Sequence, residues 1–197
     1  MLASLTGGDC VINNISTGDD VETTRKCLAD CGIASEKNGT TVLLQGGALQ
    51  SPNIPLNCGN SGTTVRLLAG LLAGSGVTAK FIGDKSLSKR PMDRIIDPLT
   101  KMGVSIESQN GYLPISLTSE KLFGINYSMP ISSAQVKSCI ILAGLGAFGE
   151  TKIQEKIKSR DHTEIMLKEF GAEINNEKVV SVKPLKKPLA KFQITIP

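Results

Sequence analysis

The sequence predicts an α+β (α/β) fold in which one small unit of helices and strands is used three times around buried helices. Three segments share the same order of features: a polar helix start, an amphipathic helix, a glycine and a β-hairpin pattern. These segments are 20–46, 90–117 and 160–184. Gly32 to Gly103 spans 71 residues and Gly103 to Gly171 spans 68, so the repeat is close to seventy residues. Because helix, glycine and hairpin form a common pattern, an accidental recurrence is the alternative.

Strands and turns complete each expected unit. The strand-like runs are 10–15, 78–82, 151–157 and, near the end, 191–196. Asn38-Gly39 and Asn110-Gly111 are typical two-residue hairpin turns, and residues 175–177 occupy the same place in the third unit. The predicted order within a unit is therefore strand, helix, hairpin and second helix.

The second helix of a unit is apolar on nearly every face. Segments 61–73 and 133–147 have this composition, which predicts two central, buried helices. The outer helices carry ordinary start signals. Asp19 and Asp161 each precede a glutamate by three residues, the spacing of a capping box, and Pro91 suits the first turn of a helix.

Composition limits the classes of function. The chain has 197 residues with 40% apolar content, enough for one domain with a real core. Its net charge of +4 is too small to indicate nucleic-acid binding, and no basic run with interleaved aromatic residues supports that class. A mildly basic protein without such a run fits a small anionic ligand better.

Five scattered cysteines and a single histidine indicate neither a disulfide framework nor a zinc site, and no cofactor or metal is expected. Cys27 and Cys31 are four residues apart on an expected helix, which favours burial. The N-terminus lacks the features of a signal peptide, and the longest apolar stretch, 139–148, is too short to span a membrane. We therefore expect a cytoplasmic setting.

Residues 56–70, with the sequence LNCGNSGTTVRLLAG, are the most informative stretch. A glycine-bracketed turn with Asn, Ser and Thr runs directly into an apolar helix, so unpaired N–H groups and small hydroxyls gather at the helix start. Such a place binds anions. The alternative is an ordinary helix capped by Asn60 or Ser61.

Four blocks of the chain carry a resemblance to a known family. They are 56–74, 83–92, 130–138 and 159–164. In this order and spacing they resemble the 5-enolpyruvylshikimate-3-phosphate synthases. The resemblance implies one domain of an enolpyruvyl transferase fold, the inverse α/β prism, with three β-α-β-α-β-β units packed around buried helices. It implies a single domain over 1–197, with internal repeats at roughly 9–75, 76–148 and 149–197.

The resemblance also implies an activity and a site. Members of the family transfer the enolpyruvyl group of phosphoenolpyruvate to the 5-hydroxyl of shikimate 3-phosphate and release phosphate. The residues matching the family's phosphoenolpyruvate contacts are Gly62, Thr63, Arg66, Arg90 and Gln135. Those matching its shikimate 3-phosphate contacts are Ser133, Ala134, Gln135, Ser159 and Arg160, where Ala134 replaces a serine of some members. A side chain at Gly62 is expected to crowd the phosphoenolpyruvate pocket.

Other polar residues near these motifs are given lesser roles. His162 is not expected to transfer protons, because it lies in a capping sequence and the family pattern gives it no such role. Asp84, Lys85 and Lys89 are expected to be solvated loop charges. Lys137 lies one helical turn beyond Ser133 and could tune the local field.

Two elements of the resembled enzymes have no match in this sequence: an upstream Pro-Gly-Ser-Lys-Ser-type segment and a second domain that supplies the acid and base groups. The chain is therefore expected to be one domain of the enzyme, with negligible turnover alone. Its expected partners are the two anionic substrates and that second domain, and not nucleic acid or a membrane. Two alternatives are a non-catalytic anion-binding module and a sugar-nucleotide enolpyruvyl transferase, a relative expected to carry a reactive loop cysteine.

Overall fold

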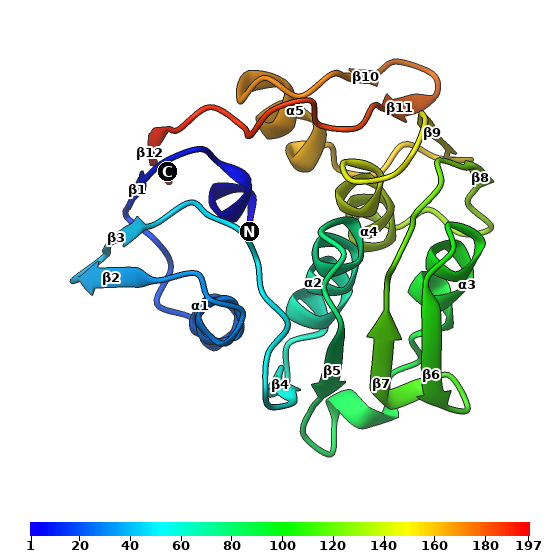
Figure 1. The fold of residues 1–197 in the computed structure, drawn as a ribbon, viewed down its shortest axis with the longest axis horizontal. Helices are drawn as coiled ribbons and strands as arrows, with labels where there is room; N and C mark the ends of the chain where they lie inside the picture. The colour runs from blue at the N-terminus through cyan, green and yellow to red at the C-terminus, as the bar shows by residue number, and fades with distance from the viewer.

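Two helices lie side by side at the centre of the molecule, and three four-stranded sheets surround them (Figure 1). This computed structural model describes residues 1–197. The central helices are α2 (Gly62–Gly74) and α4 (Ala134–Gly144). Most of their residues are buried, so the prediction of two central helices from their all-round apolar composition is confirmed.

Each sheet combines one parallel pair of strands with an antiparallel hairpin. The first sheet has the order β12 (Gln193–Thr195), β1 (Cys10–Asn13), β3 (Thr41–Leu44), β2 (Ser35–Asn38). The second has the order β4 (Leu56–Asn57), β5 (Ala79–Ile82), β7 (Tyr112–Thr118), β6 (Ser105–Gln109). The third has the order β10 (Ile174–Asn176), β11 (Val180–Val182), β9 (Thr151–Gln154), β8 (Asn126–Ser128).

Three outer helices and two short 3₁₀ turns complete the fold. The outer helices are α1 (Asp19–Asp30), α3 (Asp93–Lys101) and α5 (His162–Glu169). The 3₁₀ turns are η1 (Leu2–Leu5) and η2 (Leu87–Lys89). No helix combines the length and the apolar composition needed to cross a membrane.

The chain runs twice through the same β-α-β-α-β-β sequence, first as β4-α2-β5-α3-β6-β7 and then as β8-α4-β9-α5-β10-β11. The first sheet instead joins strands from both ends of the chain, because β12 pairs with β1. The second and third sheets therefore begin at Leu56 and Asn126, not at the expected repeat boundaries 76 and 149. β4 and β8 have only two and three residues, too few to show a strand pattern in the sequence.

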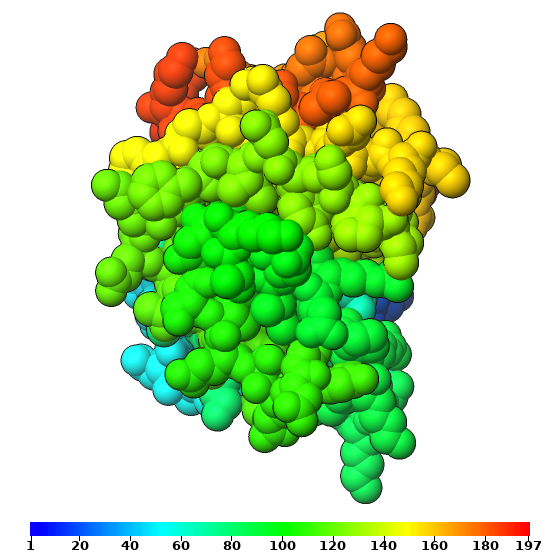
Figure 2. Space-filling model, turned by 90° about the vertical axis from the view of Figure 1, so that its right-hand side faces the viewer, coloured from blue at the N-terminus to red at the C-terminus, as the bar shows by residue number.

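The second and third units form one continuous surface on the side away from the first sheet. Figure 2 shows this face, where the green residues of α3, β6 and β7 cover most of the area and the yellow and orange residues of the third unit form the upper edge. The outer helices and the sheets thus lie outside α2 and α4.

The two central helices run parallel and very close together. A Cβ on Gly70 would overlap the carbonyl of Cys139, and one on Gly146 would overlap that of Gly74, so glycine is required at both crossings. At the N-terminal end, the Gln135 amide donates to the Thr63 hydroxyl at 2.8 Å. The two helix N-termini are therefore neighbours, and their dipoles point the same way.

The hairpin predictions differ in outcome. Asn110 and Gly111 form the turn of the second hairpin, with φ of 52° and 79°, as predicted for a two-residue turn. The first hairpin turns one residue later than predicted, because Asn38 pairs with Thr41. The third turns on 177–179 instead of 175–177, since Asn176 pairs with Val180.

The predicted capping boxes are wrong. Gly18, not Asp19, caps α1, and no side chain accepts a hydrogen bond there. Asp161 does stand at the N-cap of α5, but its carboxylate accepts from the Asn176 amide at 3.0 Å instead of capping the helix. Pro91 lies outside α3, whose N-cap is Met92. These side chains are used in tertiary contacts, which local spacing does not reveal.

Candidate functional site

The start of α2 is a capped helix that still has free backbone donors. The Ser61 hydroxyl accepts from the Thr64 amide at 3.1 Å, while the amides of Gly62 and Thr63 donate to no group in the structure. The Thr64 hydroxyl in turn hydrogen-bonds Thr24 of α1 at 2.8 Å. The two interpretations of this motif are therefore compatible, because Ser61 caps the helix and the first two amides remain open to an anion.

Two arginines converge on this helix start. A Cβ placed on Gly62 would lie 2.7 Å from Nη1 of Arg66 and 3.4 Å from Nη1 of Arg90. Arg66 also donates to the Gln135 side chain at 3.0 Å, and Gln135 donates to Thr63. Gly62, Thr63, Arg66, Arg90 and Gln135, all predicted from the sequence as one group, thus form a contiguous set that we call the arginine cluster.

The electrostatic state of this cluster favours an anion. The pKa of Arg66 is lowered first by its partial burial and then by the positive charges of Arg90 and Arg94. Bringing a negative charge here would relieve that repulsion. Arg94, in the first turn of α3, is absent from the sequence-based site. Its spacing of four residues from Arg90 is the signal that could have drawn attention to it.

A series of side-chain hydrogen bonds holds Arg90 over the turn. Asp84 accepts from the Asn60 amide at 2.8 Å, and the Asn60 carbonyl oxygen accepts from Arg90. Asp84 also accepts from the backbone of Leu87 at 2.7 Å and of Ser86 at 2.9 Å. The backbone bond from Leu87 and then the Asn60 amide hold the pKa of Asp84 below its ordinary value. Asp84 is exposed as expected, but it organises the loop instead of being a free charge.

The start of α4 repeats the arrangement at α2. The Ser133 hydroxyl accepts from the Val136 amide at 3.5 Å, and the amides of Ala134 and Gln135 have no partner. Because the helices are parallel and adjacent, four unpaired amides face the same end of the molecule. A negative group there meets two helix N-termini at once.

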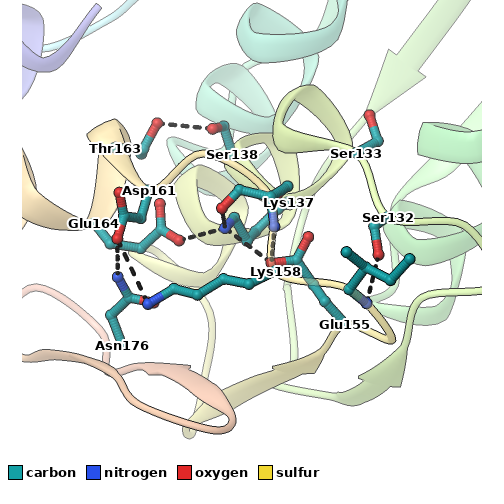
Figure 3. Close-up of polar contacts among 12 residues, drawn as sticks. Ser132, Ser133, Lys137, Ser138, Glu155, Lys158, Asp161, Thr163, Glu164 and Asn176 are labelled. Atoms are coloured by element: carbon teal, nitrogen blue, oxygen red, sulfur yellow. Dashed lines mark hydrogen bonds and ion pairs between the residues drawn. The ribbon is translucent and has the colours of Figure 1, made fainter.

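Ser159 and Arg160 lie in the 155–161 loop, which packs against the first turns of α4 (Figure 3). Lys137 of α4 donates to the Ser159 carbonyl at 3.4 Å. Arg160 is exposed, and its guanidinium makes no hydrogen bond or ion pair. Of the predicted shikimate 3-phosphate group, Ser133, Ala134 and Gln135 are consecutive at the helix start, and Ser159 is attached through Lys137. The Arg160 side chain makes no hydrogen bond or ion pair with any of them.

Lys137 is a fully buried residue that the sequence did not identify as such. Its ammonium group lies 2.9 Å from Glu155 and 2.7 Å from Glu164, two carboxylates that are themselves nearly inaccessible (Figure 3). We call these three residues the lysine cluster. No local pattern marks them, because Glu155 and Glu164 are far from Lys137 in the chain.

His162 has no polar partner in the site. It lines an apolar groove of about 290 Å³ together with Met166 and Phe192. That His162 transfers no proton stays a prediction. Cys27 and Cys31 are buried and all five cysteines are free, in line with their expected role as small apolar residues.

Comparisons with known proteins place this geometry in a family. The family model for EPSP synthase (3-phosphoshikimate 1-carboxyvinyltransferase) matches residues 1–197. The 3-phosphoshikimate 1-carboxyvinyltransferase of Ruthia magnifica is 48% identical over 182 residues, which are 90% of this chain and 42% of that protein. The one from Alkaliphilus metalliredigens is 45% identical over 186 residues, 92% of this chain and 44% of that protein.

A solved structure agrees with these relatives. The EPSP synthase from Acinetobacter baumannii superimposes with a TM-score of 0.94 at 38% identity, covering 100% of this chain and 46% of the other. The chain therefore spans less than half the length of the relatives it matches. On the family model, the identities and the shared fold together, the chain belongs to the EPSP synthase family.

Proposed function

We propose that this chain supplies one wall of a 3-phosphoshikimate 1-carboxyvinyltransferase site, at which phosphoenolpyruvate and shikimate 3-phosphate bind. The main support for this proposal is the pair of parallel helix N-termini, with four unpaired amides beside Arg66 and Arg90. Both substrates are anions that carry phosphate and carboxylate. Free N–H groups at helix starts and the forked guanidinium are the donors that proteins use for those groups.

In this proposal the start of α2 and the start of α4 bind different substrates. The arginine cluster binds phosphoenolpyruvate: Arg66 and Arg90 pair with its charged groups, and the backbone at Gly62 and Thr63 approaches it directly. The start of α4 binds shikimate 3-phosphate through Ser133, Ala134 and Gln135, with Ser159 and Arg160 completing the phosphate contacts. Gln135 already hydrogen-bonds Arg66 and Thr63, which supports a role between the two substrates.

The reaction forms a bond from the shikimate 5-hydroxyl oxygen to the carbon of phosphoenolpyruvate that carries the phosphate. It breaks the bond between that carbon and the phosphate oxygen. It also moves a proton to and from the substrates, which requires a positioned acid and base. The arginine cluster itself contains no carboxylate or imidazole. Nearby Asp84 accepts hydrogen bonds from Asn60 and the loop backbone, and His162 lines an apolar groove. We infer that a second domain provides these groups and that turnover by this chain alone is negligible.

We further propose that residues 1–197 form one domain with three internal repeats and that the protein works in the cytoplasm. Five free cysteines, all buried, support a reducing compartment.

Titration of the 197-residue chain with shikimate 3-phosphate, followed by phosphoenolpyruvate, tests the proposal. Amide NMR signals of Ala134 and Gln135 should shift with the first ligand, and those of Gly62 and Thr63 with the second. Arg90→Ala should weaken phosphoenolpyruvate binding by about tenfold or more, as for the loss of a charge-assisted bidentate contact.

Lys89→Ala is the matched control, because Lys89 is adjacent, exposed and equally charged but has no polar side-chain partner. Equal losses in the two variants would mean that only net charge matters, and the proposed site would be wrong. The absence of any shift with either anion would overturn it as well.

A further inference from the structure

The two central helices provide an internal comparison. Ser61 and Ser133 are the N-caps of α2 and α4, so Val65 and Lys137 are the fourth residues of the two helices. Both are fully buried, with 0% exposure. The apolar Val65 shows that this position of the fold needs no charge. A buried lysine is costly unless it is fully paired, so Lys137 calls for a specific reason.

The partners of Lys137 come from two other segments. Glu164 is in the first turn of α5, where the helix dipole favours a carboxylate. Glu155 directly follows β9 and begins the 155–161 loop. The side-chain exposures are 0% for Lys137, 6% for Glu155 and 1% for Glu164, so solvent does little to weaken these ion pairs.

The lysine cluster also holds the backbone of the loop. Lys137 donates to the Ser159 carbonyl at 3.4 Å, and the Ser159 amide donates to Glu155 at 3.4 Å. Both bonds fix Ser159 itself, the residue next to Arg160. The loop is therefore anchored from inside at the point where its polar residues emerge.

Two further hydrogen bonds flank this anchor (Figure 3). The Ser132 hydroxyl accepts from the Ile157 amide at 3.1 Å, and the hydroxyls of Ser138 and Thr163 are 2.7 Å apart. They connect the same loop and the start of α5 to the first turns of α4. Lys158, Ser159 and Arg160 thus lie between fixed points on both sides.

We propose that Lys137, Glu155 and Glu164 are positioning residues, which hold the 155–161 loop so that Ser159 and Arg160 meet the phosphate bound at the start of α4. The inference rests on the proposed function, since it assigns the affinity for that phosphate partly to three residues that never touch it. The apolar Val65 at the equivalent place in α2 agrees with this assignment, because the loop beside α2 is held by the side chains of Asp84, Asn60 and Arg90 instead.

The ionisation of the cluster agrees with its geometry. Burial alone would lower the pKa of Lys137, but the attraction of the Glu164 and Glu155 carboxylates outweighs it, and the pKa is raised. Burial alone would raise the pKa of Glu155, but the bonds from Ser159 and Lys137 outweigh it, and the pKa is lowered. Lys137 and Glu155 are therefore both charged at neutral pH.

A neutral replacement of the cluster separates positioning from folding. Apolar residues of similar volume can replace a buried ionic cluster without loss of stability. The variant with Lys137→Met, Glu155→Met and Glu164→Met should therefore melt at or above the wild-type temperature. Its amides at Ser159 and Arg160 should exchange with solvent faster, and its Kd for shikimate 3-phosphate should rise by about tenfold or more. A folded variant with wild-type exchange and wild-type Kd would overturn the inference.

Glu155→Gln provides a second test that does not depend on the triple variant folding, because it keeps the Lys137–Glu164 pair. The Kd for shikimate 3-phosphate should rise severalfold in the wild-type background and by a smaller factor when Arg160→Ala is already present, because only Ser159 is then left for the loop to position. The same factor in both backgrounds, or no effect in either, would contradict the inference. Glu173→Gln is the control, since Glu173 pairs with two lysines at the exposed surface.

The two proposals can fail separately. If the wild-type chain binds no shikimate 3-phosphate, or if Arg160→Ala binds it unchanged, the assignment of the phosphate site is wrong. Hydrogen exchange at Ser159 and Arg160 in Glu155→Gln still reports whether the cluster holds the loop. Unchanged exchange there would overturn the positioning role by itself.

Discussion

The starts of α2 and α4 meet through Thr63 and Gln135, yet the loops beside them are held by opposite means. Asp84, Asn60 and Arg90 fasten the 83–90 loop through exposed side chains. The 155–161 loop is fastened by Lys137 from inside the core. Exposed contacts are weak and exchange readily with water or a ligand, whereas buried charges are hard to separate.

The difference suggests a division of labour. At α2, the Arg90 guanidinium is held only by exposed side chains, so it can exchange them for an anion at little cost. At α4, the 155–161 loop is held by buried contacts before any ligand arrives, so the proposed shikimate 3-phosphate site needs less ordering on binding. The following variants test this contrast, from the largest expected effect to the smallest.

Lys137→Met should produce the largest effect, because it leaves Glu155 and Glu164 buried without a cation. The free energy of unfolding should fall by about 3–5 kcal/mol, as for breaking a buried ion pair. Urea denaturation measures this loss. Lys186→Met, which removes an exposed partner of Glu173, should cost at most about 1 kcal/mol. Similar losses in the free energy of unfolding for the two variants would show that the buried and the exposed ion pairs do not differ in strength.

The first residues of the two helices offer a reciprocal pair, since α2 begins with Gly62 and α4 with Ala134. In Gly62→Ala the new Cβ would press on Arg66 Nη1, 2.7 Å away, and displace that guanidinium. We expect phosphoenolpyruvate binding to weaken by about tenfold while stability changes little or rises, as alanine is the better helix former.

Ala134→Gly should do the reverse, with a loss of about 0.5–1 kcal/mol of stability. Shikimate 3-phosphate binding should change little, because glycine keeps the unpaired backbone amide that we propose as the contact. Calorimetric titration and thermal melting of both variants check the pair. An unchanged affinity in Gly62→Ala would show that Arg66 does not contribute to the anion site.

The N-cap serines should differ in the same direction as their geometry. Ser61→Ala removes an acceptor 3.1 Å from the Thr64 amide and should cost about 1 kcal/mol. Ser133→Ala removes one at 3.5 Å and should cost less in stability, but it should weaken shikimate 3-phosphate binding. Urea denaturation and ligand titration separate the two effects. A larger stability loss for Ser133→Ala would contradict the assignment of Ser133 as the weaker cap.

How far the sequence could predict these features depends on the distance between the partners. The central helices follow from all-round apolar composition, and the turn at Asn110-Gly111 follows from two adjacent residues that adopt positive φ. The free amides at the start of α2 follow from the small residues around Gly62, whereas Ser133 is pointed out only by the family resemblance. Each of these signals lies within a few residues of chain.

The lysine cluster had no such signal. Glu155 and Glu164 lie 18 and 27 residues beyond Lys137, and neither belongs to the same helix as Lys137. Asp161 and Glu164 have the spacing of a capping box, and this spacing does not reveal which group Glu164 pairs with in the folded chain. In the folded chain it turns to Lys137, because an unpaired buried ammonium would cost more than an uncapped helix end.

The smallest expected difference between the two loops is in how their contacts respond to low pH. Because the pKa of Glu155 is lowered in the folded protein, the unfolded chain binds more protons, and this contribution to stability is complete above about pH 4.5, the ordinary value for a glutamate. It is lost as the pH falls through the lowered pKa. Glu155→Gln should therefore flatten the fall in stability below that pH, measured by urea denaturation at several pH values. Asp84→Asn should flatten the pH dependence less, because exposed contacts contribute little to stability. If Asp84→Asn flattens it more than Glu155→Gln does, the acid-sensitive contacts lie at α2 instead of α4.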